Sequence, residues 1–144
     1  DADFLDLYAG SGSVGIEALS RGARFATFVD ENPNCISIVR QNLSMLRLLD
    51  RARLVRANIT KGLHVISGPF DVIFMGPPYH DQKWNAFTLT NPTLKEIKRH
   101  QLLKPGGVVV GQHHVKEVIA PDPSWNRYRE EHYGDSILSF FKLV

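Results

Sequence analysis

The chain has 144 residues, of which 43% are hydrophobic and 22% are charged, a composition typical of one globular domain with a single core. We therefore expect one domain over residues 1–144. The net charge of +2 does not by itself indicate a nucleic-acid-binding protein, and the single cysteine, Cys35, excludes an internal disulfide. No apolar run approaches the roughly 18 residues of a membrane span, so we expect a soluble, cytoplasmic protein with no membrane partner.

Short apolar runs rich in Val, Ile, Phe and Leu alternate with longer segments of helical periodicity. This alternation is typical of βαβ units and predicts a Rossmann-like α/β fold with a mostly parallel sheet. We expect the first helix to end at Gly22 and the second to begin at Pro33. The last helix is expected to end at the segment KPGG at 104–107. The C-terminal segments NRYREEHYG and SILSFFKL predict an antiparallel hairpin at the sheet edge. Strands are expected at 4–8, 26–29, 54–56, 72–75 and 108–111, and helices at 14–21, 33–46, 61–66 and 93–103.

The first predicted strand leads into the segment DLYAGSGSVG, where Gly10, Gly12 and Gly15 match the dinucleotide pattern GxGxxG. Glycines let the backbone approach a ligand closely, and the helix that follows presents unpaired N–H groups to an anionic group. A pyrophosphate or a carboxylate would suit this loop, and a tight turn without a ligand is the alternative. Tyr8 and Ser11 are placed in the same predicted site.

Asp30 ends the second predicted strand, twenty residues after the first glycine of the loop. An acid at this position accepts hydrogen bonds from ribose hydroxyls, although Asp30 could instead cap the helix that follows, and Glu31 or Asn32 could share either role. Asn58 ends the third strand, where it could reach an adenine edge or be a plain turn residue, and Ile59 is placed beside it. These features indicate a nucleoside site that fits either a nicotinamide dinucleotide or S-adenosylmethionine.

Asp6 distinguishes between these two cofactors. It lies four residues before Gly10, at the mouth of the first predicted strand. An acid there can bind the ammonium group of a methionine moiety and would repel a pyrophosphate, so Asp6 favours S-adenosylmethionine. The alternative is a carboxylate whose hydrogen bonds are satisfied by the amides of the loop.

The fourth predicted strand ends on Gly76, Pro77, Pro78 and Tyr79. In an open α/β sheet this loop and the glycine loop should face one ligand crevice. The prolines make the loop stiff and extended, which holds the Pro77 carbonyl outward as an acceptor, and Tyr79 offers a flat face to a planar group. This arrangement suits a base with an exocyclic amine, because acceptors on the two N–H bonds aim the nitrogen lone pair at a sulfonium methyl. A turn without function is the alternative.

On these residues the sequence resembles the bacterial 16S rRNA guanine-N2 methyltransferase family (RsmD-type), among amino-methyltransferases with an Asp-Pro-Pro-Tyr or Asn-Pro-Pro-Tyr motif. The resemblance implies a class I enzyme that transfers a methyl group from S-adenosylmethionine to guanine N2 in 16S rRNA or small ribosomal subunit particles. It places the guanine at 77–79 and the cofactor at Asp6, Gly10, Gly12, Asp30 and Asn58. It covers nearly the whole chain and rests on FLDLYAGSGSVGIEALSRGA at 4–23, the acid at Asp30, QNL at 41–43, PPY at 77–79, LLKPGG at 102–107 and YGDSILSFF at 133–141.

The chain departs from the family pattern in two ways. Family members usually begin with a basic segment and a helix that help hold rRNA, whereas this chain enters its first strand at once, so we expect a trimmed chain with weaker RNA affinity. Gly76 replaces the Asp or Asn of the motif, so we expect slow methylation that Gly76→Asp raises at least about tenfold. The alternative function is a catalytically impaired S-adenosylmethionine and RNA-binding module, followed by a nicotinamide-dependent oxidoreductase.

Several other polar residues have weaker functional interpretations. His80 and Asp81 could supply the oxygen that position 76 lacks, or they could be ordinary loop residues. His113 and His114 resemble half of a metal site, but adjacent strand residues point to opposite faces, so we predict no metal. We also expect a monomer. Two basic groups could contact phosphates or form solvated faces: Lys95, Lys98, Arg99 and Lys104, and Arg47, Arg51, Arg53 and Arg56.

Overall fold

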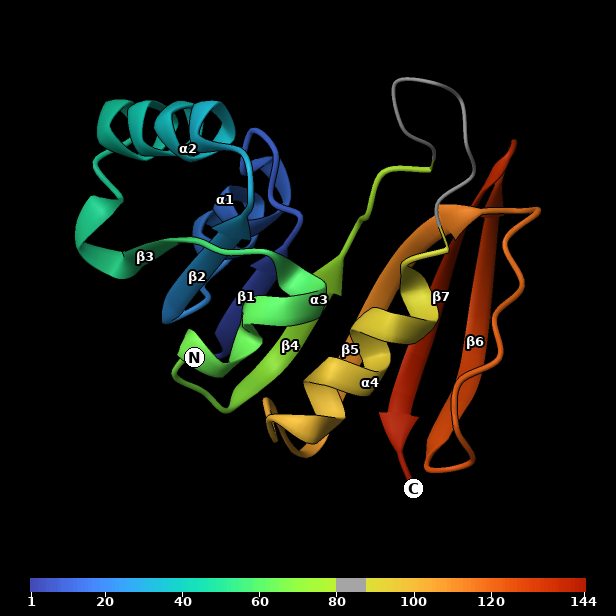
Figure 1. Ribbon diagram of the computed structural model, residues 1–144. Coiled ribbons are helices and arrows are strands. Elements are labelled where there is room, and N and C mark those ends of the chain that lie inside the picture. The colour runs from blue at the N-terminus through green and yellow to red at the C-terminus, as the bar shows by residue number, and fades with distance from the viewer. Residues whose placement is uncertain (80–87) are drawn as a thin grey trace.

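The computed structural model describes residues 1–79 and 88–144, so the predictions for His80 and Asp81 lie outside the described residues. Seven strands form one sheet in the order β3-β2-β1-β4-β5-β7-β6 (Figure 1). Strands β1 to β5 pair in parallel, whereas β7 pairs antiparallel with both β5 and β6. The predicted Rossmann-like sheet with an antiparallel hairpin at its edge is confirmed. The strands are β1 (Asp3–Leu7), β2 (Phe25–Asp30), β3 (Ala52–Arg56), β4 (Phe70–Met75), β5 (Leu103–His114), β6 (Trp125–Tyr133) and β7 (Ser136–Leu143).

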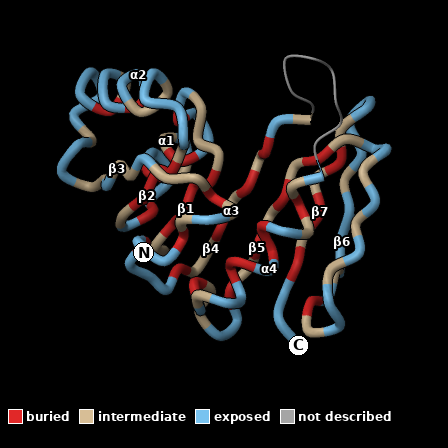
Figure 2. The backbone as a smooth tube through the Cα atoms, viewed as in Figure 1, coloured by how far each residue is buried: buried red, intermediate tan, exposed pale blue. Residues whose placement is uncertain are grey.

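Helices cover both faces of the sheet, and each face has its own hydrophobic cluster. Along β1, Leu5 and Leu7 belong to the cluster with α3 and α4, whereas Phe4 belongs to the cluster with α1 and α2, as the alternation of side chains in a strand requires. Figure 2 shows the buried residues concentrated along the central strands. The helices are α1 (Ser13–Ser20), α2 (Pro33–Met45), η1 (Leu49–Arg51), α3 (Ile59–Gly62), η2 (Leu63–Val65) and α4 (Thr90–Arg99).

The chain reverses its direction across the sheet at β1. It moves outward from β1 through β2 to β3, and then returns to β4 on the other side of β1. Leu7 pairs with Met75, so the carboxyl ends of β1 and β4 lie side by side. Ligand crevices form at such switch points, and the segments 8–12 and 76–79 both begin here.

The C-terminal end of α4 corrects one prediction. The helix was expected to reach residue 103 and to end at KPGG, but this segment lies inside β5. The helix ends earlier because Gln101 adopts a left-handed conformation with φ of 53°. The N–H of Leu102 then donates to the carbonyl of Ile97 at 3.0 Å, which closes a helix terminus that glycine usually makes.

The start of α4 is also earlier than predicted, at Thr90 rather than Thr93. Pro92 falls in the first turn, where a proline is tolerated. The N–H of Thr90 donates to Glu117 Oε2 at 3.0 Å, so a side chain 27 residues away supplies an acceptor for the helix terminus.

Smaller differences concern element lengths. The helix predicted at 61–66 is the α-turn α3 followed by the 3-10 turn η2, and β3 begins two residues before the predicted position 54. Strand β5 extends beyond residue 111 because it pairs with β7 as far as His114. Among the described helices, none is both long and apolar enough to cross a lipid bilayer.

Candidate functional site

A cavity of about 870 Å³ opens beyond the carboxyl ends of the central strands. It brings together five residues that the sequence placed in the cofactor site: Tyr8, Asp30, Glu31, Asn58 and Ile59. Gly76 and Pro78 also line it. Asn32, which the sequence analysis considered together with Glu31, lines it as well. The sequence analysis missed further lining residues, although three of them directly follow Asn32 and the acidic strand end could have indicated them: Pro33, Asn34, Cys35, Thr60 and Leu89.

The predicted residues Gly10, Ser11 and Gly12 lie in the loop that connects β1 to α1, and the lining of this cavity does not include them. Gly10 and Gly12 adopt left-handed conformations with φ of 59° and 82°, which explains why the loop requires glycine. The N–H of Gly10 donates to Asp30 Oδ2 at 3.0 Å, so the loop is attached to the end of β2.

The carboxylate of Asp30 organises the backbone around the cavity. Its Oδ1 accepts a hydrogen bond from the N–H of Asn32 at 2.9 Å, while its Oδ2 holds Gly10. The side chain that caps α2 is instead that of Asn32, whose Oδ1 accepts from the N–H of Asn34 at 2.8 Å. Asp30 is half-buried at the cavity wall, and each of its oxygens can accept more than one hydrogen bond.

Asp6 lies beneath the glycine loop and is only 1% exposed. Its Oδ2 accepts a hydrogen bond from the N–H of Gly15 at 3.0 Å, so one carboxylate oxygen is satisfied by an amide in the first turn of α1, where the alternative interpretation expected amides of the preceding loop. Burial raises the pKa of Asp6 to about 7; the Gly15 hydrogen bond opposes this rise and the charge of Asp30 adds to it. The predicted contact with an ammonium group stays a prediction.

Tyr8 connects the end of β1 to α4. Its backbone is left-handed, with φ of 60°, a conformation that costs a non-glycine residue on the order of 1 kcal/mol or more and that often occurs at functional sites. Its hydroxyl lies 2.8 Å from Thr93 Oγ1. Burial raises the pKa of Tyr8 to about 12, so the hydroxyl keeps its proton at neutral pH.

Asn58 and Glu31 meet across the crevice between β2 and β3. The side-chain amide of Asn58 donates to Glu31 Oε1 at 3.2 Å, and Asn58 Oδ1 accepts from the Thr60 hydroxyl at 3.1 Å. Arg56 Nε donates to the backbone carbonyl of Glu31 at 3.0 Å. Asn58 is therefore part of a polar wall of the cavity, and its contact with an adenine edge stays a prediction.

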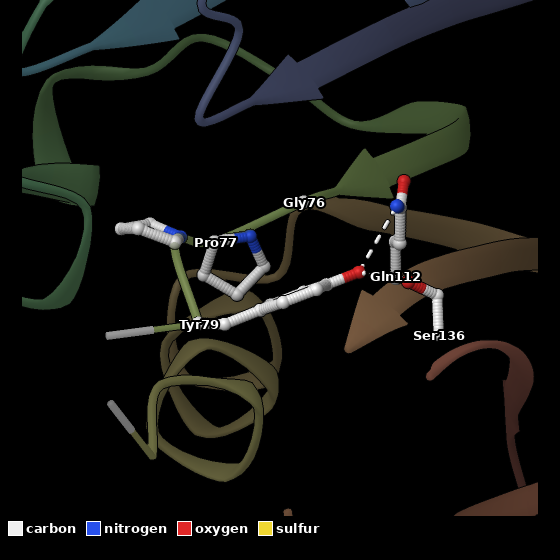
Figure 3. Close-up of a pocket in the computed structure, with 6 residues that line it drawn as sticks. Gly76, Pro77, Tyr79, Gln112 and Ser136 are labelled. Carbon is white, nitrogen blue, oxygen red and sulfur yellow. Dashed lines mark hydrogen bonds between the residues drawn. The ribbon is translucent and has the colours of Figure 1, made fainter. Parts of the chain in front are cut away.

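A second cavity, of about 370 Å³, is lined by all four residues of the Gly-Pro-Pro-Tyr segment (Figure 3). The Tyr79 ring runs across it, and the hydroxyl lies 2.7 Å from Ser136 Oγ and accepts a hydrogen bond from Gln112 Nε2 at 3.1 Å. The ring of His114 packs against the Tyr79 ring edge-on, with centroids 5.6 Å apart. Sequence reasoning missed Gln112 and considered His114 only as half of a metal site. Ser136 lay within the stretch YGDSILSFF, which was the only available signal.

Gly76 and Pro78 line both cavities. The larger cavity has polar residues that end β2 or follow β2 and β3, and the smaller one has an aromatic ring and side chains of β5 and β7. The two cavities therefore adjoin at the start of the Pro-Pro segment.

The two histidines of β5 point to opposite faces of the sheet, as predicted. His113 is buried, its Nε2 lies 2.7 Å from Ser139 Oγ, and burial lowers its pKa, whereas His114 lies beside Tyr79. The described residues, 1–79 and 88–144, contain no group of three or more acidic, histidine or cysteine side chains that could hold a metal.

Several of the predicted phosphate-binding residues have structural partners. Lys104 lies at the amino end of β5, away from the two cavities, and its Nζ is 3.0 Å from Asp71 Oδ2 and 3.2 Å from Asp3 Oδ2. Arg51 donates to backbone carbonyl oxygens in and just after α1. These contacts favour structural roles for Lys104 and Arg51. Further ion pairs join Lys98 to Asp122 and Arg99 to Glu96.

Comparison with known proteins gives the family of the chain. The family model described as "Conserved hypothetical protein 95" matches residues 1–142. "Putative rRNA methyltransferase YlbH" of Bacillus subtilis (strain 168) is 36% identical over 143 residues, which are 96% of this chain and 74% of that protein. "Ribosomal RNA small subunit methyltransferase D" of Escherichia coli (strain K12) is 28% identical over 135 residues, which are 93% of this chain and 65% of that protein.

The fold is shared with solved structures. "Putative methyltransferase yhhF from Escherichia coli" has a TM-score of 0.84 and 26% identity, and the match covers 99% of this chain and 77% of that one. The resemblance to methyltransferases that the Gly-rich and Pro-Pro-Tyr segments indicated is thereby confirmed. The chain belongs to the Conserved hypothetical protein 95 family, together with relatives that are named as rRNA methyltransferases.

Proposed function

We propose that this chain transfers a methyl group from S-adenosylmethionine to the exocyclic N2 of a guanine in small-subunit rRNA. The observation that carries the proposal is the pair of cavities that share Gly76 and Pro78. Methyl transfer needs a cofactor site and a planar-base site in direct contact, because the donor and acceptor atoms must be aligned at close range. The name of the Escherichia coli relative supports the small ribosomal subunit as the source of the substrate.

The larger cavity has the chemistry that S-adenosylmethionine requires. Asp30 offers carboxylate oxygens for ribose hydroxyls, and Asn58 offers an amide for the adenine edge. Gly12 lets the loop pack closely on α2, since a Cβ there would meet the Val39 side chain at 3.1 Å. When bound, this cofactor supplies an electrophilic sulfonium methyl group.

Asp6 gives the cofactor site a proton-linked component. Its pKa of about 7 means that a large fraction of the carboxyl groups carry a proton at neutral pH. A methionine ammonium group would favour the charged carboxylate and would lower this pKa on binding. Cofactor affinity should therefore increase as the pH rises toward 7.

The smaller cavity would receive the target base. The Tyr79 ring is held by its hydroxyl, so its face can support a planar base without first losing rotational freedom. The Pro77 carbonyl is proposed to accept an N–H of the exocyclic amine. After methylation the amine is cationic and acidic, and it can release its proton to water.

The remaining predictions follow from this activity. Small ribosomal subunit particles or 16S rRNA are the proposed partners, and a cytoplasmic monomer is the expected form. A nicotinamide-dependent oxidoreductase is not favoured, because the family relatives are named as rRNA methyltransferases. The impaired-module alternative depends on Gly76 alone, and an activity measurement decides it.

Two measurements test the proposed function. Calorimetric titration should show binding of S-adenosylmethionine and none of NAD. Incubation of unmethylated small-subunit particles with methyl-labelled S-adenosylmethionine should then yield labelled N2-methylguanosine after nuclease digestion. Binding of NAD alone, or label on any other nucleoside, would refute the proposal.

A further inference from the structure

Gln112 is the lateral neighbour of the position where the family motif carries an acidic or amide side chain. Met75, the last residue of β4, pairs with Gly111 in parallel register, so Gly76 directly follows β4 at the position beside Gln112 of β5. Side chains in register on neighbouring parallel strands point to the same face and lie about 4.8 Å apart. A side chain at position 76 would point to the same face as that of Phe74. A Cβ at position 76 would lie 3.1 Å from the Phe74 ring.

The amide of Gln112 is oriented by Tyr79. Its Nε2 donates to the Tyr79 hydroxyl at 3.1 Å, and that hydroxyl can in turn donate a hydrogen bond to Ser136 Oγ at 2.7 Å. Figure 3 shows the Gln112 oxygen on the side of the amide that faces away from the Tyr79 hydroxyl. Within residues 1–79 and 88–144, no hydrogen bond engages Gln112 Oε1, and the residue lines the same cavity as Gly76.

We infer that Gln112 Oε1 accepts an N–H of the exocyclic amine of the target base and so replaces the oxygen that Gly76 lacks. The inference rests on the proposed function and names a residue for the same reaction. A neutral amide oxygen is the type of acceptor that Asn provides in the motif, and it accepts an amine N–H without requiring a charge. Together with the Pro77 carbonyl, it provides one acceptor for each N–H bond of the amine.

This assignment reverses the expectation for Gly76→Asp. If position 76 were simply deficient, adding a carboxylate would raise the rate at least about tenfold in the unchanged chain. If Gln112 already supplies the acceptor, Gly76→Asp should change the rate less than about threefold there, and should raise it at least about tenfold only when Gln112 is replaced.

The test is single-turnover methylation of unmethylated small-subunit particles at saturating S-adenosylmethionine. Gln112→Leu should lower the rate about 100-fold with unchanged cofactor affinity, and Gln112→Glu, which keeps an acceptor, should retain most of the rate. Gln41→Leu, at an exposed site on α2, is the matched control and should have no effect. Circular dichroism of each variant verifies that the chain is folded.

Tyr79→Phe distinguishes a direct contact between Gln112 and the target base from a role of Gln112 in orienting Tyr79. It does so because it removes the hydroxyl to which Gln112 donates. If Gln112 acted only by orienting Tyr79, then Gln112→Leu would have no further effect in the Tyr79→Phe background. We expect a further loss of at least about tenfold in that background, and its absence would overturn the inference.

A binding measurement gives a readout that does not depend on turnover. With S-adenosylhomocysteine bound, the chain should bind a short uridine-flanked RNA with one guanosine about tenfold more tightly than the same RNA with inosine, which lacks the exocyclic amine. Gln112→Leu should abolish this preference. A preference that survives Gln112→Leu refutes the role of Gln112 alone, whereas an unchanged chain that neither prefers guanosine nor methylates it refutes the proposed function and the inference with it.

Discussion

The two cavities are organised by different kinds of hydrogen bond. At the cofactor side, carboxylates hold backbone amides: Asp6 holds Gly15, and Asp30 holds Gly10, across 9 and 20 residues. At the target side, side chains hold a side chain: Ser136 and Gln112 hold Tyr79 across 57 and 33 residues. The two carboxylate contacts of the cofactor side therefore lie within the single unit β1-α1-β2, whereas the contacts of Tyr79 require β5 and the C-terminal hairpin to be in place.

Protonation of Asp6 should produce the largest effect and is confined to the cofactor side. Its pKa is raised from 3.8 to about 7 in the folded chain, so the folded state keeps a proton that the unfolded chain releases. The free energy of unfolding should therefore fall as the pH rises from about 4 to 7, by up to about 4 kcal/mol. Urea denaturation across this range measures the slope.

Asp6→Asn should flatten that slope, because its amide does not titrate. Asp50→Asn, at an exposed position, should leave the slope unchanged. Asp6→Asn also tests the ammonium contact. The affinity for S-adenosylmethionine should rise with pH in the unchanged chain, and it should stay weak and independent of pH in Asp6→Asn. Equal slopes for all three chains would mean that Asp6 is not the group responsible.

Gly15→Ala should disrupt the cofactor side through packing. A Cβ at Gly15 would lie 2.3 Å from Cε2 of the fully buried Phe28, so the ring or the helix must move. We expect a loss of about 3 kcal/mol in the free energy of unfolding and reduced cofactor affinity, measured by urea denaturation and calorimetry. Gly62→Ala is the control, since its Cβ would lie an ordinary 3.4 Å from Ala57; a similar loss there would argue against the packing explanation.

Tyr79→Ala tests whether the two sides act independently. Removing a stacking ring should cost about 1 to 3 kcal/mol in the single-turnover barrier, while S-adenosylmethionine affinity stays nearly the same. Single-turnover methylation and calorimetry on the same preparation provide both values. Equal losses in rate and affinity would indicate that Tyr79 supports the structure of both cavities.

Asp30→Ala, in contrast to Tyr79→Ala, should weaken cofactor binding. We expect a loss of about 1 to 3 kcal/mol in cofactor affinity through the lost ribose hydrogen bonds. Calorimetry measures the affinity, and Asp50→Ala controls for the change in net charge. If the affinity is unchanged, the role of Asp30 is limited to holding Gly10 and Asn32.

Asn32→Ala should have the smallest effect, about 1 kcal/mol in the free energy of unfolding, because it removes the cap of α2. Asn34→Ala keeps the backbone N–H that the cap binds and should cost less. Thermal or urea unfolding distinguishes them, and equal costs would show that the Asn32 side chain does not stabilise the helix.

The glycine loop and the acid at the end of β2 were recognisable in the sequence because their requirements are local. Gly10 and Gly12 had to be glycines for their left-handed backbone, and the acid at Asp30 follows at the spacing of one βαβ unit. The alternation of apolar and helical segments likewise predicted the sheet. Even here the assignment of the helix cap needed the structure, because Asp30 and Asn32 are both good capping residues.

The ends of the helices could not all be predicted from the neighbouring residues. Three helices close with a residue in the left-handed conformation, but only Gly22 was recognisable, since Arg47 and Gln101 adopt the same conformation without being glycine. The start of α4 depends on an acceptor from Glu117. Neither feature can be deduced from the neighbouring residues.

The sequence by itself determined the fold class, the glycine loop and the Pro-Pro-Tyr segment. Each of them depends on local backbone conformation, which restricts the residue types at neighbouring positions. Only the tertiary structure decided that Gln112, His114 and Ser136 surround Tyr79. Their placement depends on the register of β5 with β4 and β7, which is set when the strands pair and determines which side chains share a face.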